Sequence, residues 1–241
     1  MRVPLKLKFY YLLSRFFQKN KTPNFSMDTP REIRPGEEFA LEKLKTYLSE
    51  NNINTDNLSI KQFPSGYSNL TYFLKSSSQE FVLRRPPFGA KSLKGGHDMF
   101  REYNVLKNLK SQFTKVPDVY LYCDNNEIIG VPFYLMQRVE GYIIRPNLQQ
   151  KDSPGKEVIQ SVSKSLVSSL VELHNVDIDQ ANLNELGNIN GYIKRQVEGW
   201  IKRYNHSKTD SIANMEFIAS WLHKNQPVEV QGSIVHNDFK Y

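Results

Sequence analysis

The heptapeptide IVHNDFK, residues 234–240, carries the sharpest signal in this chain of 241 residues. An aspartate two residues after a histidine, at the end of a short apolar stretch, is typical of a phosphoryl-transfer loop. In such a loop Asp238 orients an acceptor hydroxyl and takes its proton, His236 braces the backbone, and Lys240 reaches the transferring phosphate. The same pattern is common in polar turns, so its interpretation depends on what precedes it.

The residues upstream of this motif first predict a β-rich half. Three strand-like segments joined by short turns indicate an antiparallel meander, and two further segments follow a helix expected over residues 98–110. That helix should bury one face carrying Phe100, Tyr103, Leu106 and Leu109. The five expected strands cover residues 59–63, 70–75, 80–85, 117–122 and 131–139.

The remainder of the chain predicts helices. Apolar residues at helical spacing place one helix over residues 37–50, before the strands, and three more after them, over residues 156–174, 188–204 and 213–224. A short strand over residues 228–235 should then lead into His236. The expected fold class is α+β, with an antiparallel five-strand lobe containing one helix, a short connector and a helical lobe.

Two features of the β-rich half have the chemistry to bind phosphates. The hairpin tip between the first two strands carries Ser65, Gly66, Ser68 and Asn69, whose amides and hydroxyls can cradle an anion. On the third strand, alternation puts Val82 and Arg84 on one face and Arg85 on the other, so that an apolar contact for a base and a cation for phosphates point the same way. An ordinary polar turn and a surface arginine are the alternatives.

Two further features fit this interpretation. Glu102, on the polar side of the helix over residues 98–110, can pair with Arg84 and orient it, as the lysine–glutamate pair does in protein kinases. Met136 ends an apolar strand and would face a base, while the Gln137 carbonyl and the Val139 amide could bond the edge of an adenine. Each feature is modest alone, but their order along the chain is that of a kinase.

The chain resembles the aminoglycoside phosphotransferase family of protein-kinase-like small-molecule kinases. It is most similar to the branch that includes the kinase-like domain attached to some acyl-CoA dehydrogenases. The resemblance covers residues 37–241 and rests on the stretches SGYSNLTY, FVLRRPP, REYNVL, VPFYLMQRVEG, VELHNVD, GYIKRQVEGW and IVHNDFK.

This resemblance implies a two-lobe, protein-kinase-like fold and an ATP- and Mg²⁺-dependent transfer of the γ-phosphate to a hydroxyl of a small molecule. The acceptor would be a hydroxyacyl-CoA-like or other hydroxylated metabolite, with aminoglycosides, choline-like alcohols and sugars as alternatives. The domains expected are a basic extension (residues 1–26), a nucleotide-binding lobe (27–136), a hinge (137–141) and a partial helical lobe (142–241).

The family pattern also requires metal ligands after the catalytic aspartate. A metal-binding asparagine would stand five positions after Asp238, at position 243, and a second acidic ligand would follow on the next strand. The sequence stops at Tyr241, so neither ligand is present in it. We therefore expect a C-terminally incomplete kinase that does not turn over by itself, or alternatively a pseudokinase-like binding or regulatory remnant.

Composition narrows the possible partners and location. The net charge is +7, but residues 1–26 hold six basic and no acidic side chains. In the rest of the chain 26 basic residues nearly balance 25 acidic ones. No nucleic-acid partner is therefore expected. The single cysteine, Cys123, excludes an internal disulfide and favours a reducing cytoplasm. Residues 1–21 could form a membrane-surface helix, but we favour the alternative that translation begins at Met27.

Overall fold

The computed structural model describes residues 29–64, 69–89, 97–141, 155–229 and 232–239. The chain divides into two compact units, one formed by residues 184–233 and one by the described residues before and after them. The lobe and hinge boundaries expected from the sequence stay predictions. The basic segment over residues 1–26 lies outside the described residues.

The larger unit is built on a five-stranded antiparallel sheet with the strand order β1-β2-β3-β5-β4. The first three strands form the expected meander, while β5 inserts between β3 and β4. All five lie within two residues of the ranges expected from alternation and turn residues. Their bounds are β1 Ser59–Gln62, β2 Leu70–Lys75, β3 Glu80–Arg85, β4 Val119–Cys123 and β5 Phe133–Gln137.

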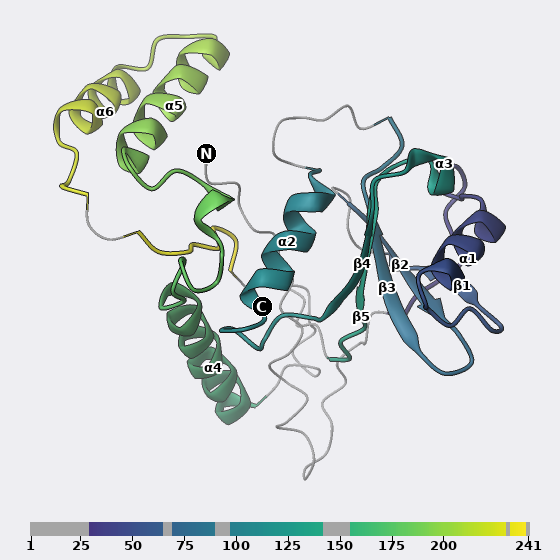
Figure 1. Ribbon diagram of the computed structural model, residues 1–241. Coiled ribbons are helices and arrows are strands. Elements are labelled where there is room, and N and C mark those ends of the chain that lie inside the picture. The colour runs from purple at the N-terminus through teal and green to yellow at the C-terminus, as the bar shows by residue number, and fades with distance from the viewer. Residues whose placement is uncertain (1–28, 65–68, 90–96, 142–154, 230–231, 240–241) are drawn as a thin grey trace. The chain divides into compact units, whose positions relative to one another are not determined.

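Helices cover both faces of this sheet (Figure 1). The helix α1 (Leu41–Glu50) and the short α3 (Asn126–Ile129) lie on one face, and α2 (Met99–Leu109) packs on β4 and β5 from the other. Residues 37–40, which the sequence pattern assigned to the first helix, precede α1 and are not helical. The short helix α3 lies between β4 and β5 in the chain.

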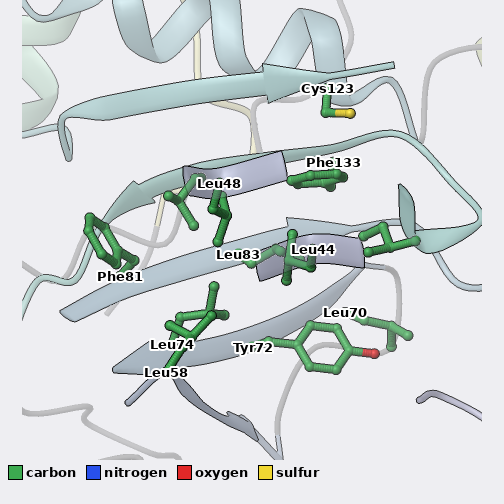
Figure 2. Close-up of a cluster of buried hydrophobic side chains, with 12 residues drawn as sticks. Leu44, Leu48, Leu58, Leu70, Tyr72, Leu74, Phe81, Leu83, Cys123 and Phe133 are labelled. Carbon is green, nitrogen blue, oxygen red and sulfur yellow. The ribbon is translucent and has the colours of Figure 1, made fainter. Parts of the chain in front are cut away.

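The apolar core of this unit lies between α1 and the sheet (Figure 2). Strand alternation sends every second side chain to this face, which is why its members recur at a spacing of two along β2 and β3. The cluster is made up of Leu44, Leu48, Leu58, Leu70, Tyr72, Leu74, Phe81, Leu83, Cys123, Ile129, Phe133 and Leu135.

The expected apolar face of α2 was partly wrong. The helix buries Met99, Val105, Leu106 and Leu109, whereas Phe100 is 53% exposed. The stripe that faces the sheet runs through Met99 and Val105, and Phe100 lies about 100° away from Met99 around the helix axis. Its ring instead contacts Tyr122 of β4, with centroids 5.1 Å apart.

Two helical expectations were close. The helix α4 spans Lys156–His174, the range predicted from its apolar spacing, and α6 spans Ala213–Lys224. The helix α5 spans Tyr192–Ser207 and so begins four residues later than expected. Its first turn is capped by Glu229, whose carboxylate accepts hydrogen bonds from the amides of Ile193 (2.8 Å) and Gly191 (2.6 Å). These amide bonds lower the pKa of Glu229.

The strand expected over residues 228–235 was wrong for the residues described there, which form no regular structure. A strand satisfies its backbone only by pairing, and an apolar, β-branched run does not become one without a neighbouring ladder. None of the helices in the described part of the chain has the length and hydropathy needed to cross a bilayer.

Candidate functional site

The central feature of the sheet face covered by α2 is an ion pair between β3 and α2. Arg84 Nε donates to Glu102 Oε2 at 2.7 Å, and the two side chains are only 17% and 26% exposed. This is the pair expected from the sequence. Glu102 lies on the sheet side of α2, in the stripe that contains Val105 and Leu106, rather than on a polar outer face.

Strand pairing explains why Arg84 reaches α2. Arg84 lies opposite Thr71 on β2 and Tyr134 on β5, so the three side chains share the face on which α2 packs. Arg85, one position later, points to the opposite face and is fully buried. The assignment of the two arginines to opposite faces, made from alternation alone, is confirmed.

Two more side chains hold the Glu102 carboxylate. Asn69 Nδ2 donates to Glu102 Oε1 at 2.9 Å, and the Tyr134 hydroxyl donates to Glu102 Oε2 at 3.1 Å. Burial, and then the negative charge of Glu102, raises the pKa of Tyr134 well above its ordinary value, so that its hydroxyl stays protonated and keeps donating. The carboxylate therefore receives three donors and is held in one orientation.

An apolar row lies beside the ion pair on the same face. Val82 pairs with Phe73 on β2 and with Met136 on β5, and Val82 and Phe73 are 7% and 8% exposed. The Arg138 guanidinium lies over the Phe73 ring, 4.6 Å from its centroid. The structure thus brings Val82 and Met136 together as neighbours, next to Arg84.

The backbone after Met136 is held by Asp118. The Gln137 amide donates to the Asp118 carbonyl at 2.8 Å, and Gln137 Oε1 accepts from the Asp118 amide at 3.2 Å. The roles toward an adenine expected for the Gln137 carbonyl and the Val139 amide stay predictions. Ser65, Gly66, Ser68 and Lys240 lie outside the described residues.

The His236–Asp238 segment has a compact local geometry. His236 is 2% exposed, and its Nδ1 accepts a hydrogen bond from the Asp238 amide at 3.3 Å. Between them Asn237 has a φ of 61°, a left-handed conformation that asparagine tolerates better than most residues. The His236 ring also packs edge-on against Phe239, with centroids 5.4 Å apart. His236 thus contacts the backbone at Asp238, while the bracing role of His236 and the catalytic role of Asp238 stay predictions.

Replacing His236 by alanine should loosen this segment. The variant loses the acceptor for the Asp238 amide and leaves a gap beside Phe239, so we expect the amide of Asp238 to exchange with deuterium at least about tenfold faster. Hydrogen exchange of the peptide over residues 234–239 measures this. His206→Ala, on the exposed surface of α5, is the control. Unchanged exchange at Asp238 would contradict the bracing role.

Three side chains at the site were not predicted from the sequence. Tyr134 and Phe73 could have been found, because alternation along their strands puts them on the face of Arg84 and Val82. His97, whose Nδ1 lies 2.7 Å from Asn69 Oδ1, has no comparable local signal. It is placed by the packing of α2, which begins two residues later.

Comparison with known proteins agrees with this geometry. The family model described as "Phosphotransferase enzyme family" matches residues 59–240, which include the ion pair, the apolar row and the His236–Asp238 segment. The chain belongs to this phosphotransferase family. The family predicted from the sequence is thereby confirmed, and with it the α+β, kinase-like fold.

Curated relatives of this phosphotransferase-family chain are larger proteins. Rat acyl-CoA dehydrogenase family member 11 is 38% identical over 89% of this chain and 28% of its own length. Mouse acyl-CoA dehydrogenase family member 10 is 34% identical over 83% of this chain and 18% of its own length. The match thus spans between 18% and 28% of the length of these two relatives.

A solved structure supports the same fold for the phosphotransferase-family chain. The crystal structure of a Ralstonia eutropha protein described as an aminoglycoside phosphotransferase superimposes with a TM-score of 0.70 at 28% identity. The match covers 84% of this chain and 59% of the Ralstonia chain.

Proposed function

We propose that this chain binds ATP and takes part in transfer of its γ-phosphate to a hydroxyl of a small molecule. The observation that carries the proposal is the Arg84–Glu102 ion pair, held by two further donors and flanked by an apolar row on one sheet face. A cation of fixed orientation beside an apolar surface suits a nucleotide, which has phosphates at one end and a flat base at the other.

Arg84 can bind phosphates through the planar set of donors of its guanidinium. Protein kinases use a lysine here, whose ammonium is a point charge, whereas a guanidinium offers a planar set of donors. The observed pair engages Arg84 through Nε, which sets the plane of the guanidinium. In the proposed complex Arg84 binds the phosphates, and Val82 and Met136 exclude water from one side of the base.

The reaction would use the His236–Asp238 segment. The acceptor hydroxyl gives its proton to the Asp238 carboxylate as its oxygen bonds the γ-phosphorus, and the bond from that phosphorus to the β–γ bridging oxygen breaks to release ADP. His236 holds the Asp238 backbone by the hydrogen bond described above.

Mg²⁺ is the second cofactor that the family implies. Bound together with ATP, Mg²⁺ would supply positive charge that stabilises the transferring phosphate. Among the described residues no group of three His, Cys, Asp or Glu side chains could hold a metal ion. Mg²⁺ that is bound with a nucleotide needs only one or two protein carboxylates, and we assign no step to the ion.

The acceptor we propose is a hydroxylated metabolite of the hydroxyacyl-CoA kind. Its support is the likeness to relatives named as acyl-CoA dehydrogenase family members, to which this chain is 34–38% identical. A panel of small hydroxylated acceptors tested for phosphorylation would identify it.

Nucleotide binding tests the proposal directly. We expect the chain to bind ADP more tightly than adenosine in the presence of Mg²⁺, and Arg84→Met to weaken ADP binding about tenfold or more while leaving adenosine affinity unchanged. Titration calorimetry measures both affinities. Arg203→Met removes a similar charge from the exposed surface of α5 and is the matched control.

The outcomes separate the candidate functions. Absence of ADP binding at millimolar concentrations, or an Arg84→Met variant with the wild-type ADP affinity, would refute a nucleotide site at this face. Binding that depends on Arg84 in a protein that phosphorylates no acceptor would favour the pseudokinase-like alternative, a binding or regulatory module.

A further inference from the structure

The Arg84–Glu102 pair continues into a longer chain of hydrogen bonds. Glu102 Oε1 accepts from Asn69 Nδ2 at 2.9 Å, and Asn69 Oδ1 lies 2.7 Å from His97 Nδ1. Asn69 is only 3% exposed, so its amide has been removed from water and needs these partners. Neither Asn69 nor His97 belongs to β3 or α2, which carry the ion pair. Asn69 directly precedes β2, and His97 directly precedes Asp98, the residue that caps α2.

The chemistry of the acceptors decides where the protons lie. A carboxylate oxygen can only accept, so the Asn69 side chain must present its nitrogen to Glu102 and its oxygen to His97. The amide oxygen in turn can only accept, so His97 Nδ1 must carry a hydrogen. The neutral imidazole is therefore the tautomer protonated at Nδ1. Each contact orients the next, from His97 to Asn69, Glu102 and Arg84.

The position of the two residues makes this chain a brace between elements. Asn69 directly precedes Leu70, the first residue of β2, and His97 directly precedes Asp98, whose side chain caps α2 by accepting from the Arg101 amide at 2.9 Å. The Asn69–His97 contact thus ties the start of β2 to the start of α2. Within the described part of the chain, the hydrogen bond that holds Glu102 Oε1 comes from Asn69.

We propose that Asn69 and His97 are positioning residues that hold the Glu102 carboxylate in the orientation that fixes Arg84. Neither needs to touch the nucleotide. The proposal rests on the proposed function only where nucleotide affinity is the readout. Without the brace, Glu102 keeps Arg84 and Tyr134 on Oε2 but loses the bond on Oε1, so the carboxylate can rotate and the guanidinium is less well fixed.

A double-mutant cycle separates positioning from direct contact. We expect Asn69→Ala to weaken ADP binding about fivefold to tenfold and to leave adenosine affinity unchanged. In a Glu102→Ala background, which no longer has the carboxylate to position, the same substitution should have almost no further effect. A full effect of Asn69→Ala in that background would overturn the proposal, because Asn69 would then act independently of Glu102.

Conservative variants of His97 test the tautomer and the direction of the bond. The side-chain amide of asparagine can place a donor where His97 has Nδ1–H, whereas glutamine reaches the position of Nε2. We expect His97→Asn to retain most of the ADP affinity and His97→Gln to lose it about fivefold. Equal loss in both variants, at equal thermal stability, would show that the donor at Nδ1 is not what matters.

A spectroscopic readout keeps the inference separate from nucleotide binding. In the nucleotide-free protein, ¹⁵N shifts of His97 should report a hydrogen on Nδ1, and the Arg84 Nε–H signal should be slow to exchange. Asn69→Ala should speed that exchange about tenfold. If these signals behave as expected but no ADP binds, the proposed function fails and the brace stands. If ADP binds but Arg84 Nε–H is unaffected by Asn69→Ala, the brace fails alone.

Discussion

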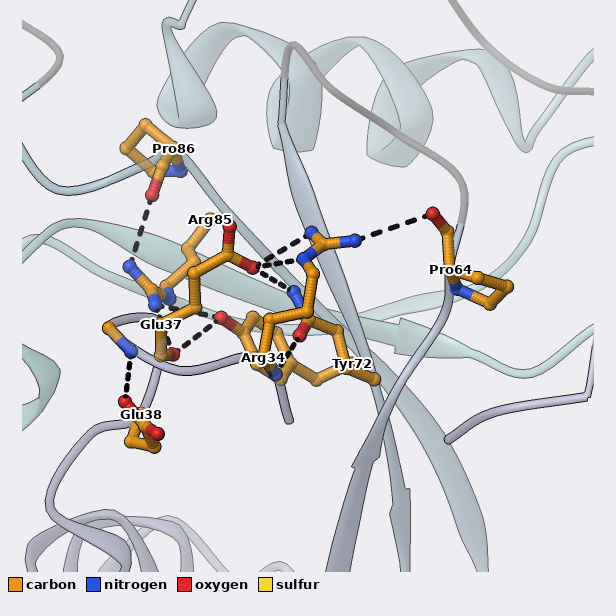
Figure 3. Close-up of polar contacts among 9 residues, drawn as sticks. Arg34, Glu37, Glu38, Pro64, Tyr72, Arg85 and Pro86 are labelled. Carbon is orange, nitrogen blue, oxygen red and sulfur yellow. Dashed lines mark hydrogen bonds and ion pairs between the residues drawn. The ribbon is translucent and has the colours of Figure 1, made fainter. Parts of the chain in front are cut away.

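Replacing Arg85 by alanine will lower the free energy of unfolding by about 3 kcal/mol, among the largest losses expected from a single substitution in this protein. Arg85 is fully buried, on the sheet face opposite Arg84. Figure 3 shows its polar contacts with Glu37, Tyr72 and Pro86. Its guanidinium donates to the Glu37 carbonyl at 2.6 Å, the Tyr72 hydroxyl at 2.7 Å and the Pro86 carbonyl at 3.3 Å. Truncation removes these bonds and leaves a cavity.

Aromatic rings around the guanidinium add to this loss. The Arg85 Cζ atom lies 4.0 Å from the ring centroid of Phe88, 5.2 Å from that of Tyr72 and 5.5 Å from that of Phe39. Burial lowers the pKa of Arg85, an effect that the Tyr72 hydroxyl and the Glu37 carboxylate oppose. The buried guanidinium is thus stabilised by oxygen acceptors and by the faces of aromatic rings. Its contacts join the segment before α1 to β2 and β3.

Denaturant unfolding monitored by circular dichroism measures this prediction. The matched control is Arg203→Ala, because Arg203 also lies over a ring, that of Trp200 at 4.8 Å, but is exposed. It should cost about 1 kcal/mol or less. Arg85→Met, which keeps most of the volume, should recover part of the loss. If Arg85→Ala is no more destabilising than Arg203→Ala, the buried cluster does not stabilise the fold.

Glu102→Ala should combine a stability loss of about 2–3 kcal/mol with a loss of nucleotide affinity of about tenfold, close to that of Arg84→Met. The Glu102 carboxylate is the acceptor for Arg84, Asn69 and Tyr134, and the Tyr134 side chain is 1% exposed. Removing the Glu102 carboxylate takes this acceptor away from the Tyr134 hydroxyl, the Asn69 side-chain amide and the Arg84 guanidinium. Such loss of a shared acceptor costs more than the loss of one exposed ion pair.

Two measurements check the Glu102 prediction, thermal or denaturant unfolding and ADP titration. Glu102→Gln should keep much of the stability, since its amide oxygen still accepts, but it removes the charge that attracts Arg84. The control Glu172→Ala breaks the Lys115–Glu172 pair, in which Glu172 is 53% exposed, and should cost less than about 1 kcal/mol. Equal stability losses for Glu102→Ala and Glu172→Ala would contradict the assigned role of the carboxylate.

Local sequence patterns were enough to predict the positions of most strands and helices. Alternation located β2 and β3 at the residues observed, and helical spacing located α4, because both patterns repeat over a few residues. Alternation also separated Arg84 from Arg85. It failed for the described part of residues 228–235, since an apolar run becomes a strand only when another strand lies beside it.

The candidate site was only partly accessible to the same reasoning. The Arg84–Glu102 pair was expected from the order of motifs, and it is present. The two other partners of Glu102 were not expected, because Asn69 is 33 residues and Tyr134 is 32 residues away from it in the chain. The orientation of α2, which buries Met99 and exposes Phe100, decided which of these side chains could meet.

What the sequence determined by itself is the set of local elements, the faces of the strands and the motifs that indicate a phosphotransferase. What only the tertiary structure decided is how polar side chains share partners, as Asn69, Tyr134 and Arg84 do on Glu102, and how Arg85 is enclosed by aromatic rings. The physical reason is how far along the chain each kind of interaction acts. Backbone preferences and side-chain periodicity act over neighbouring residues, whereas hydrogen bonds between distant segments depend on how the helices pack against the sheet.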